Sequence, residues 1–353
     1  MMDRIKDDIR AGRRISEEDA LLLLEEGGLA LLGQLANEVR KRLHPDNEIT
    51  YVIDRNINYT NICISGCKFC AYYCAPGDPS GYVLSRDELG RKLEETLALG
   101  GRQVLLQGGL HPDLPFEFYE EMLSFIKGYG IHCHAFSAPE VVHFSRISGL
   151  DVEEVLERLV MAGLDSIPGG GAEILVDRVR ESVAPRKATT DEWLEVMEKA
   201  HGLGLRTTAT MMFGHVETPE ERIEHMSRLR ELQDRTGGFT AFIPWPFQPG
   251  NTAIETEPAT GHDYLRTLAV SRLFLDNIPN IQASWVTQGA KVAQISLFFG
   301  ANDFGSTMIE ENVVAAAGVS HRLSEDEIRN IVRGAGFEPV RRRMDYTRIR
   351  EDE

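Results

Sequence analysis

The chain has 353 residues, of which 38 are Lys or Arg and 55 are Asp or Glu, so its formal net charge is −17. This acidic balance excludes nucleic acid as the main partner, because a phosphate backbone requires a basic surface. No run approaches the roughly 18 consecutive apolar residues that span a bilayer, and the opening MMDRIKDDIRAGRR lacks the apolar stretch of a signal peptide. We therefore expect a globular cytoplasmic protein with no membrane segment.

Two helices are predicted within the first 45 residues. Ser16 precedes an acidic turn and then four leucines, Leu21 to Leu24, which is the pattern of a capped helix start. A second amphipathic helix is predicted over 29–43.

From Thr50 onward, strand-like and helix-like segments alternate. Strands are predicted over 51–59, 103–107, 131–136, 164–167, 205–213, 239–243, 280–285 and 296–300. Helices are predicted over 86–99, 115–127, 152–162, 191–203, 219–235 and 263–276. Alternation of this kind implies parallel strands joined by crossover helices, and eight units over about 250 residues suit an α/β fold of the (β/α)8 TIM-barrel type.

A doubly wound open sheet is the alternative fold, but no G-x-G-x-x-G follows the first strand to favour it. The prediction is a barrel over residues 49–318, with an N-terminal helical cap over 1–48 and a C-terminal extension over 319–353 packed on the barrel. The ends of the predicted strands carry glycines and polar residues, for example Gln107-Gly108-Gly109, Ser137 and Gly214-His215. The carboxyl ends of barrel strands meet on one face, where active sites of this fold lie.

Five cysteines are present: Cys63, Cys67, Cys70, Cys74 and Cys133. An odd number in a large chain does not indicate a disulfide framework. The first three form a C-x3-C-x2-C motif directly after the first predicted strand. Three thiolates in one loop bind three irons of a [4Fe–4S] cluster, and the iron without a protein ligand stays open to a small molecule.

Two other interpretations of the cysteines remain. A structural zinc site usually takes four ligands from two separated pairs, and the chain has no second C-x2-C pair. Cys74 as a fourth ligand would close the site and leave no position for catalysis. In the interpretation that we favour, Cys74 and Cys133 are ordinary thiols.

The motif Cys63, Cys67, Phe69 and Cys70 resembles the C-x3-C-x-aromatic-C signature of radical S-adenosylmethionine (SAM) enzymes. The resemblance implies that the open iron binds the amino and carboxylate groups of SAM. An electron from the cluster then cleaves SAM to methionine and a 5′-deoxyadenosyl radical.

Longer stretches resemble one branch of that superfamily, the enzymes of the futalosine pathway and of deazaflavin synthesis. The stretches HAFSAPE at 134–140, PGGGAEIL at 168–175, QASWVTQG at 282–289 and FFGANDFGST at 298–307 are most similar to the cyclic dehypoxanthine futalosine synthase family of menaquinone biosynthesis. The likeness runs from about Thr50 to Ala317.

The resemblance implies a set of SAM-binding residues: Phe69, Tyr72, Gln107, Gly108, Gly109, Ser137 and Glu173. Glycine at 108 and 109 permits a close approach of the backbone to the cofactor. Ser137 also suits a helix cap, and Tyr72 suits a packed loop aromatic, so both have a structural alternative.

Candidate residues for catalysis and substrate binding follow other strands. His215 suits a proton acceptor near neutral pH, and Glu140 is an alternative base unless it only begins a helix. His134, Asn302 and Asp303 are candidates for substrate contacts, and the alternatives are a structural role for His134 and helix capping for Asn302 and Asp303. The proline-flanked Trp245 suits an apolar edge that shields a radical or stacks on a ring.

The implied reaction removes hydrogen from the ribose C4′ of dehypoxanthine futalosine. The carbon radical closes onto the benzoate ring, and loss of an electron and a proton restores aromaticity. The implied partners are this small-molecule substrate and an electron donor such as flavodoxin or ferredoxin. The alternatives are a sister enzyme (aminofutalosine synthase or a deazaflavin synthase subunit), a non-catalytic iron–sulfur electron carrier and a zinc-stabilised binding module.

Overall fold

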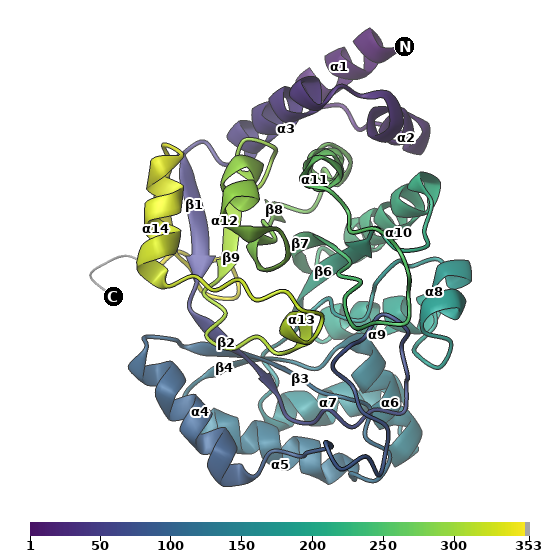
Figure 1. The fold of residues 1–353 in the computed structure, drawn as a ribbon, viewed down its shortest axis with the longest axis vertical. Coiled ribbons are helices and arrows are strands. Elements are labelled where there is room, and N and C mark those ends of the chain that lie inside the picture. Colours follow the sequence, from purple (N-terminus) through teal and green to yellow (C-terminus); the bar gives the residue numbers. More distant parts are fainter. Residues whose placement is uncertain (350–353) are drawn as a thin grey trace.

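The computed structural model describes residues 1–349 and shows a curved parallel sheet at its centre (Figure 1). Seven strands pair in chain order: β2 (Asp54–Asn58), β3 (Gln103–Gln107), β4 (His132–Ala135), β5 (Ser166–Ile167), β6 (Arg206–Phe213), β7 (Phe239–Pro246) and β8 (Asn280–Ile281). In register, Asp54 lies opposite Gln103, and Leu105 lies opposite His134. All carboxyl ends of these strands therefore face the same side of the molecule.

A second sheet closes the ring. β1 (Glu48–Val52) leads directly into β2 and pairs in parallel with β9 (Asp303–Ser306) and β10 (Glu338–Arg341). A parallel bridge between Gln282 and Asp303 joins the end of β8 to β9, and the Thr307 amide donates to the Val52 carbonyl at 3.0 Å. With β1 and β2 at one position, the strands form an eight-position barrel, so the predicted fold class is confirmed.

Helices cover the outside of the barrel. In chain order they are α4 (Arg86–Ala98), α5 (Phe116–Lys127), α6 (Ala138–Ser148), α7 (Val152–Ala162), α8 (Asp177–Val183), α9 (Thr190–Gly202), α10 (Pro219–Thr236), α11 (Gly261–Phe274), α12 (Trp285–Ser296) and α14 (Glu325–Gly334), whereas the short α13 (Val313–Ala316) lies over the centre of the barrel in the view of Figure 1. Seven begin with a capping box, in which a Ser, Thr or Asp side chain and an acidic side chain three residues later satisfy the free amides. Local sequence therefore determines where these helices begin.

The N-terminal helices α1 (Met2–Arg10), α2 (Glu17–Glu26) and α3 (Leu29–Leu43) lie at one end of the barrel, purple in Figure 1. The Ser16 side chain accepts from the Asp19 amide and so caps α2, as predicted. Leu32 and Leu35 of α3 are fully buried where this helix packs on α11. The division of the chain into a cap, barrel and extension at residues 48 and 318 stays a prediction.

The predicted strand over 296–300 is wrong. Ser296 ends α12, and helical turns follow, in which the Phe298 amide donates to the Ile295 carbonyl at 2.9 Å. β9 at Asp303–Ser306 takes the eighth position instead. A short apolar run such as 297–299 fits a buried strand or a helix end equally well, because it shows no periodicity.

The strand predicted over 280–285 is also shorter than expected, because α12 begins at Trp285.

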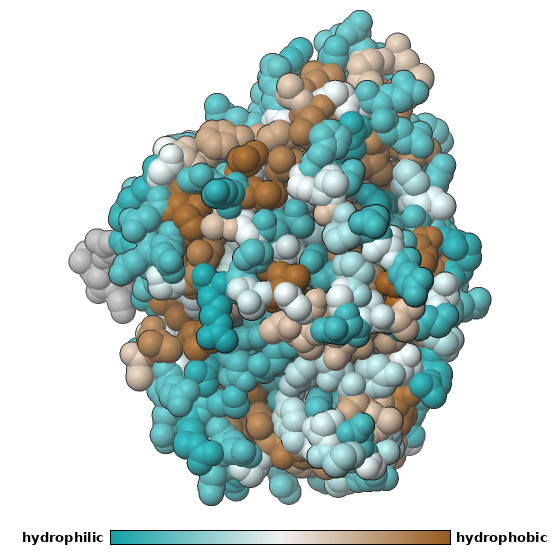
Figure 2. All heavy atoms as spheres, viewed as in Figure 1, coloured by the Kyte–Doolittle hydropathy of each residue, from teal (hydrophilic) through white to brown (hydrophobic). Residues whose placement is uncertain are grey.

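Among residues 1–349, no helix combines the length and apolar character needed to cross a membrane. Figure 2 shows hydrophilic residues over most of one face, with small separate groups of apolar residues between them.

Candidate active site

The cysteine loop follows β2 and folds back on itself. The Cys63 amide donates to the Cys74 carbonyl at 3.0 Å, and the Cys74 amide donates to the Asn61 carbonyl at 2.9 Å. The middle of the loop is tied to two other segments, since the Lys68 amide donates to the Val183 carbonyl and the Lys68 carbonyl accepts from the Ala253 amide, both at 2.8 Å. Backbone contacts from three parts of the chain therefore hold the thiols in place.

Cys63, Cys67 and Cys70 line one cavity of about 240 Å³ at the carboxyl ends of the barrel strands. The Sγ of Cys63 accepts from the Leu110 amide at 3.3 Å and from the Ser65 amide at 3.4 Å. The Ser65 hydroxyl lies 3.1 Å from the Sγ of Cys67. Donors of this kind stabilise thiolate charge, as the ligands of an iron–sulfur cluster require.

The two remaining cysteines lie apart from this set. Cys74 is buried and is not among the residues that line the cavity, and Cys133 is fully buried on β4. Burial raises the pKa of the Cys133 thiol, which keeps it neutral. Three thiols facing one cavity fit a cluster with an open iron and do not supply the fourth ligand of a closed site.

No three His, Cys, Asp or Glu side chains of residues 1–349 converge on a position for a single metal ion. In a cluster each thiolate binds a different iron, so such convergence is not required.

Gly108 and Gly109 follow β3 directly beside the cysteines. A Cβ on Gly108 would lie 2.4 Å from the Tyr59 ring, and a Cβ on Gly109 would lie 2.2 Å from the Ile62 carbonyl oxygen. Neither space admits a side chain, so this turn requires glycine at both positions. The backbone of the turn therefore lies against the cysteine loop and faces the same cavity.

Glu140 also lines the cavity, but it is already fully hydrogen bonded. Its Oε1 accepts from the Tyr59 hydroxyl at 2.7 Å and the Gly108 amide at 3.0 Å, and its Oε2 accepts from the amide and hydroxyl of Ser137, each at 2.7 Å. Burial raises the pKa of this carboxyl group. With four donors on its two oxygens, Glu140 has no free position for a substrate proton, which argues against its predicted role as a base.

Glu173 faces the cavity after β5 and is paired with two cations that the sequence alone did not single out. Lys187 Nζ lies 2.9 Å from Oε1 of Glu173, and Arg180 Nη1 lies 3.6 Å from Oε2. Burial lowers the pKa of Lys187, but Glu173 and Cys67 together outweigh this effect, so the pKa is raised. Lys187 also lies 5.1 Å from the centre of the Phe69 ring. The Arg186-Lys187 pair in an acidic chain was the available signal for Lys187.

The other predicted cofactor-binding residues are brought together. Phe69, Tyr72, Gln107 and Ser137 line the same cavity. The Tyr72 and Tyr82 hydroxyls are hydrogen bonded, and Tyr82 in turn donates to the Asn58 carbonyl at 2.9 Å. Trp245 of β7 and Val313 of α13 also line the cavity.

His215 does not reach this cavity. Its side chain is fully buried, its Nδ1 accepts from the Val216 amide at 2.8 Å, and its Nε2 lies 3.0 Å from the Met212 carbonyl. These contacts require a proton on Nε2 and leave no free acceptor. Burial also lowers the pKa of this imidazole, although Glu217 opposes the shift. The structure therefore argues against His215 as the proton acceptor.

The three predicted substrate contacts also lie elsewhere. His134 Nδ1 is hydrogen bonded to the Ser166 hydroxyl at 2.7 Å. Asn302 accepts from Arg272 at 2.6 Å and donates to Asn280 at 2.8 Å. Asp303 forms a buried ion pair with Arg342, with Nη2 to Oδ1 at 3.0 Å. None of the three lines the cysteine cavity. Their polar groups instead form hydrogen bonds and an ion pair with other residues of the protein.

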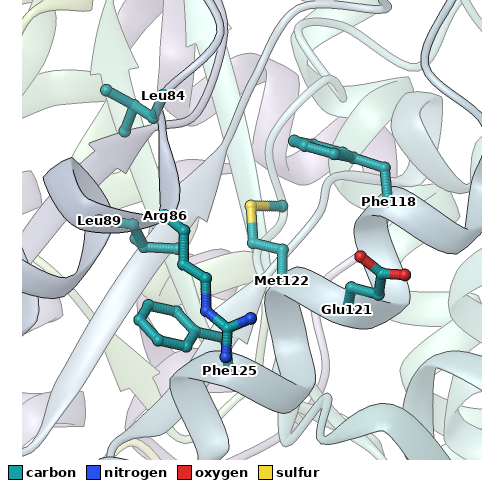
Figure 3. Close-up of a pocket in the computed structure, with 7 residues that line it drawn as sticks. All are labelled: Leu84, Arg86, Leu89, Phe118, Glu121, Met122 and Phe125. Carbon is teal, nitrogen blue, oxygen red and sulfur yellow. The ribbon is translucent and has the colours of Figure 1, made fainter.

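A separate, mostly apolar hollow of about 100 Å³ lies between α4 and α5 (Figure 3). Its lining consists of Leu84, Arg86, Leu89, Phe118, Glu121, Met122 and Phe125. Arg86 lies over the Phe125 ring, 4.5 Å from its centre. It contains no thiol and shares no lining residue with the cysteine cavity.

Comparison with known proteins agrees with this site. Residues 57–229 match the radical SAM superfamily, and residues 236–352 match the CofH/MqnC C-terminal region. A cyclic dehypoxanthine futalosine synthase from Halalkalibacterium halodurans is 47% identical over 342 residues, which cover 96% of this chain and 92% of the relative. The chain belongs to the radical SAM superfamily.

A second group of relatives is nearly as similar. A 5-amino-6-(D-ribitylamino)uracil–L-tyrosine 4-hydroxyphenyl transferase from Methanosarcina mazei is 45% identical over 366 residues, covering 99% of this chain and 96% of the relative. Among solved structures, the FeFe-hydrogenase maturase HydG from Carboxydothermus hydrogenoformans aligns with a TM-score of 0.77 at 16% identity, covering 98% of this chain and 80% of that one. Methylornithine synthase PylB aligns with a TM-score of 0.70 at 18% identity, covering 96% and 97%. These two structures share the fold.

Proposed function

We propose that this radical SAM enzyme is a cyclase that converts dehypoxanthine futalosine to its cyclic form in menaquinone biosynthesis. The observation that carries the proposal is a cavity lined by three thiols and a glycine turn, in a chain 47% identical over nearly its full length to a cyclic dehypoxanthine futalosine synthase. When bound, the [4Fe–4S] cluster and SAM supply a 5′-deoxyadenosyl radical that can remove a hydrogen atom from a nearby substrate.

The residues of the cavity divide into two groups. Cys63, Cys67 and Cys70 would hold the cluster, and the Gly108-Gly109 backbone beside them would bind SAM. Both groups lie in the part of the chain that matches the superfamily as a whole. The protein's work here is positioning, because an alkyl radical reacts with the hydrogen nearest to it.

Trp245 and Val313 line the cavity from residues 236–352, the part that matches the CofH/MqnC region. We propose that they face the substrate and keep water away from the reacting carbon. Val313 is held over the cavity by its neighbours, since Asn312 donates to Asn58 at 3.3 Å, and Asn251 donates to the Ala316 carbonyl at 2.9 Å. We also propose that flavodoxin or ferredoxin donates the electron that reduces the cluster.

The proposal is tested by anaerobic assay of the reconstituted enzyme with dithionite, SAM and dehypoxanthine futalosine. We expect 5′-deoxyadenosine together with a product two hydrogens lighter than the substrate, both measured by mass spectrometry. Substrate deuterated at C4′ should transfer its label to 5′-deoxyadenosine. Formation of 5′-deoxyadenosine with neither product nor label transfer would contradict the substrate assignment.

A second candidate function is 4-hydroxyphenyl transfer from L-tyrosine to 5-amino-6-(D-ribitylamino)uracil. It is favoured by the 45% identity to a transferase with that name over 99% of this chain. The same preparation incubated with L-tyrosine and the uracil compound distinguishes the two functions. Our proposal expects no coupled product from this pair and turnover only with dehypoxanthine futalosine.

A further inference from the structure

Glu140 is a buried carboxylate that faces the cysteine cavity without a cationic partner. Glu140 is 2% exposed, and it takes part in none of the ion pairs formed by residues 1–349. A buried charge is costly unless hydrogen bonds or an opposite charge compensate it. The protein supplies four hydrogen bonds to Glu140 and leaves the opposite charge to come from elsewhere.

Its hydrogen bonds join the ends of three neighbouring strands. One oxygen binds the Tyr59 hydroxyl after β2 and the Gly108 amide after β3, and the other binds Ser137 after β4. The Asn58 side chain donates to the Gln107 carbonyl at 3.3 Å, so the peptide group between Gln107 and Gly108 is held at both its N–H and its C=O. The Gly109 amide is held in turn by the Thr60 carbonyl at 3.0 Å.

Helix capping alone does not account for this arrangement. Glu327 occupies the same place in the capping box of α14, where its Oε2 accepts from the Ser324 amide and hydroxyl at 2.8 Å. The hydrogen bonds of that capping box join Ser324 and Glu327 to each other, and they lie on the exposed surface. Glu140 differs in being buried, in using its second oxygen for Tyr59 and Gly108, and in facing the cavity.

We propose that Glu140 is a positioning residue for SAM, which fixes the orientation of the Gly108-Gly109 turn and balances the positive charge of the bound cofactor. The positive charge of bound SAM is its sulfonium group, because its amino and carboxylate groups are the ones that bind the open iron, and the turn and the thiols place it in this cavity. The inference concerns cofactor binding, so it holds whichever of the two substrates the enzyme uses.

The substitution Glu140→Gln tests both parts of this role, the orientation of the turn and the charge. An amide has one acceptor oxygen, so in either orientation its NH2 group meets a backbone N–H, that of Gly108 or that of Ser137, and one hydrogen bond is lost. It also removes the negative charge. We expect the Kd for SAM, measured by anaerobic equilibrium dialysis, to rise at least tenfold while the iron content per chain stays at the wild-type value.

Electron paramagnetic resonance of the reduced cluster gives a readout independent of turnover. In the wild type, SAM should change the cluster signal because it binds the open iron. In Glu140→Gln the signal without SAM should be unchanged, and a higher SAM concentration should be needed to change it. Glu327→Gln is the matched control and should leave both the Kd and the signal as in the wild type.

A Kd for Glu140→Gln within twofold of the wild type would overturn the proposal. If this variant loses iron or fails to fold, Tyr59→Phe decides the question, because it removes one donor from Glu140 and keeps the ring beside Gly108 and the helix cap. A raised Kd for SAM in Tyr59→Phe supports the positioning role. An unchanged Kd overturns it.

Discussion

Cys74 lies four residues beyond Cys70, and its thiol is the nearest in sequence to the three that line the cavity. As a fourth ligand it would close the cluster, and SAM would have no iron to bind. Its backbone instead joins the two ends of the cysteine loop through Asn61 and Cys63. The thiol itself can be removed without disturbing these contacts.

We therefore predict that Cys74→Ala keeps a full complement of iron and sulfide after anaerobic reconstitution and still cleaves SAM. Cys67→Ala should lose the cluster absorbance and all 5′-deoxyadenosine formation. Iron and sulfide analysis with an ultraviolet–visible spectrum makes the comparison. If Cys74→Ala also loses the cluster while circular dichroism shows that it is correctly folded, the result would support a closed site with four ligands, as in an electron carrier.

The residues of the site that could be predicted were those whose chemistry is local in sequence. The cysteine spacing and the two glycines identify themselves within a few residues. Lys187 could not be assigned, because its partner Glu173 is 14 residues away and Phe69 is more than a hundred. His215 looked like a free base, and only the folded turn shows that the Val216 amide and the Met212 carbonyl occupy both of its nitrogens.

At the scale of elements, the segment after β10 buries Arg342 against β9. Arg342 is 3% exposed, and its guanidinium pairs with Asp303, whose carboxylate also accepts from Thr50 at 2.5 Å. Asp303 begins β9, and Thr50 lies on β1. The ion pair therefore joins the C-terminal segment to the two strands that close the barrel.

Removing the guanidinium leaves a buried carboxylate without a cationic partner, which costs about 3–5 kcal/mol. We predict that Arg342→Met lowers the free energy of unfolding by that amount, measured by anaerobic urea denaturation. Lys199→Met is the control, because its ion pair with Glu153 is exposed and such pairs contribute about 0–1 kcal/mol. A loss below 1 kcal/mol for Arg342→Met would show that the buried pair is not what secures this segment.

Most helices could be predicted from the sequence because capping boxes and apolar periodicity are local signals. The end of the barrel could not, because β8 has two residues and β9 four, and their pairing depends on the distant β1. The apolar run at 297–299 then looked more strand-like than the polar start of β9. Closure of the ring is a long-range property, and Arg342 contributes to it from the far end of the chain.

At the scale of the whole molecule, burial keeps several histidines neutral. Burial lowers the pKa of His225 to about 3 and that of His201 to about 4. The ordinary value, which applies to the unfolded chain, is about 6.5. Because the folded-state pKa is the lower one, the unfolded chain binds protons first as the pH falls, and stability present above pH 6.5 is lost toward the folded-state values.

Each such histidine should cost about 1.4 kcal/mol of folding free energy between pH 7.5 and pH 5.5, since one pH unit of this range lies below 6.5. We predict that His225→Gln, which cannot titrate, loses about 1.4 kcal/mol less than the wild type over this interval. The comparison is between the two pH-dependent losses, measured by denaturant unfolding at both pH values, so any constant cost of the substitution cancels. An equal loss in His225→Gln and the wild type would mean that His225 takes up a proton in the folded protein as readily as in the unfolded chain, and that its burial does not contribute to acid sensitivity.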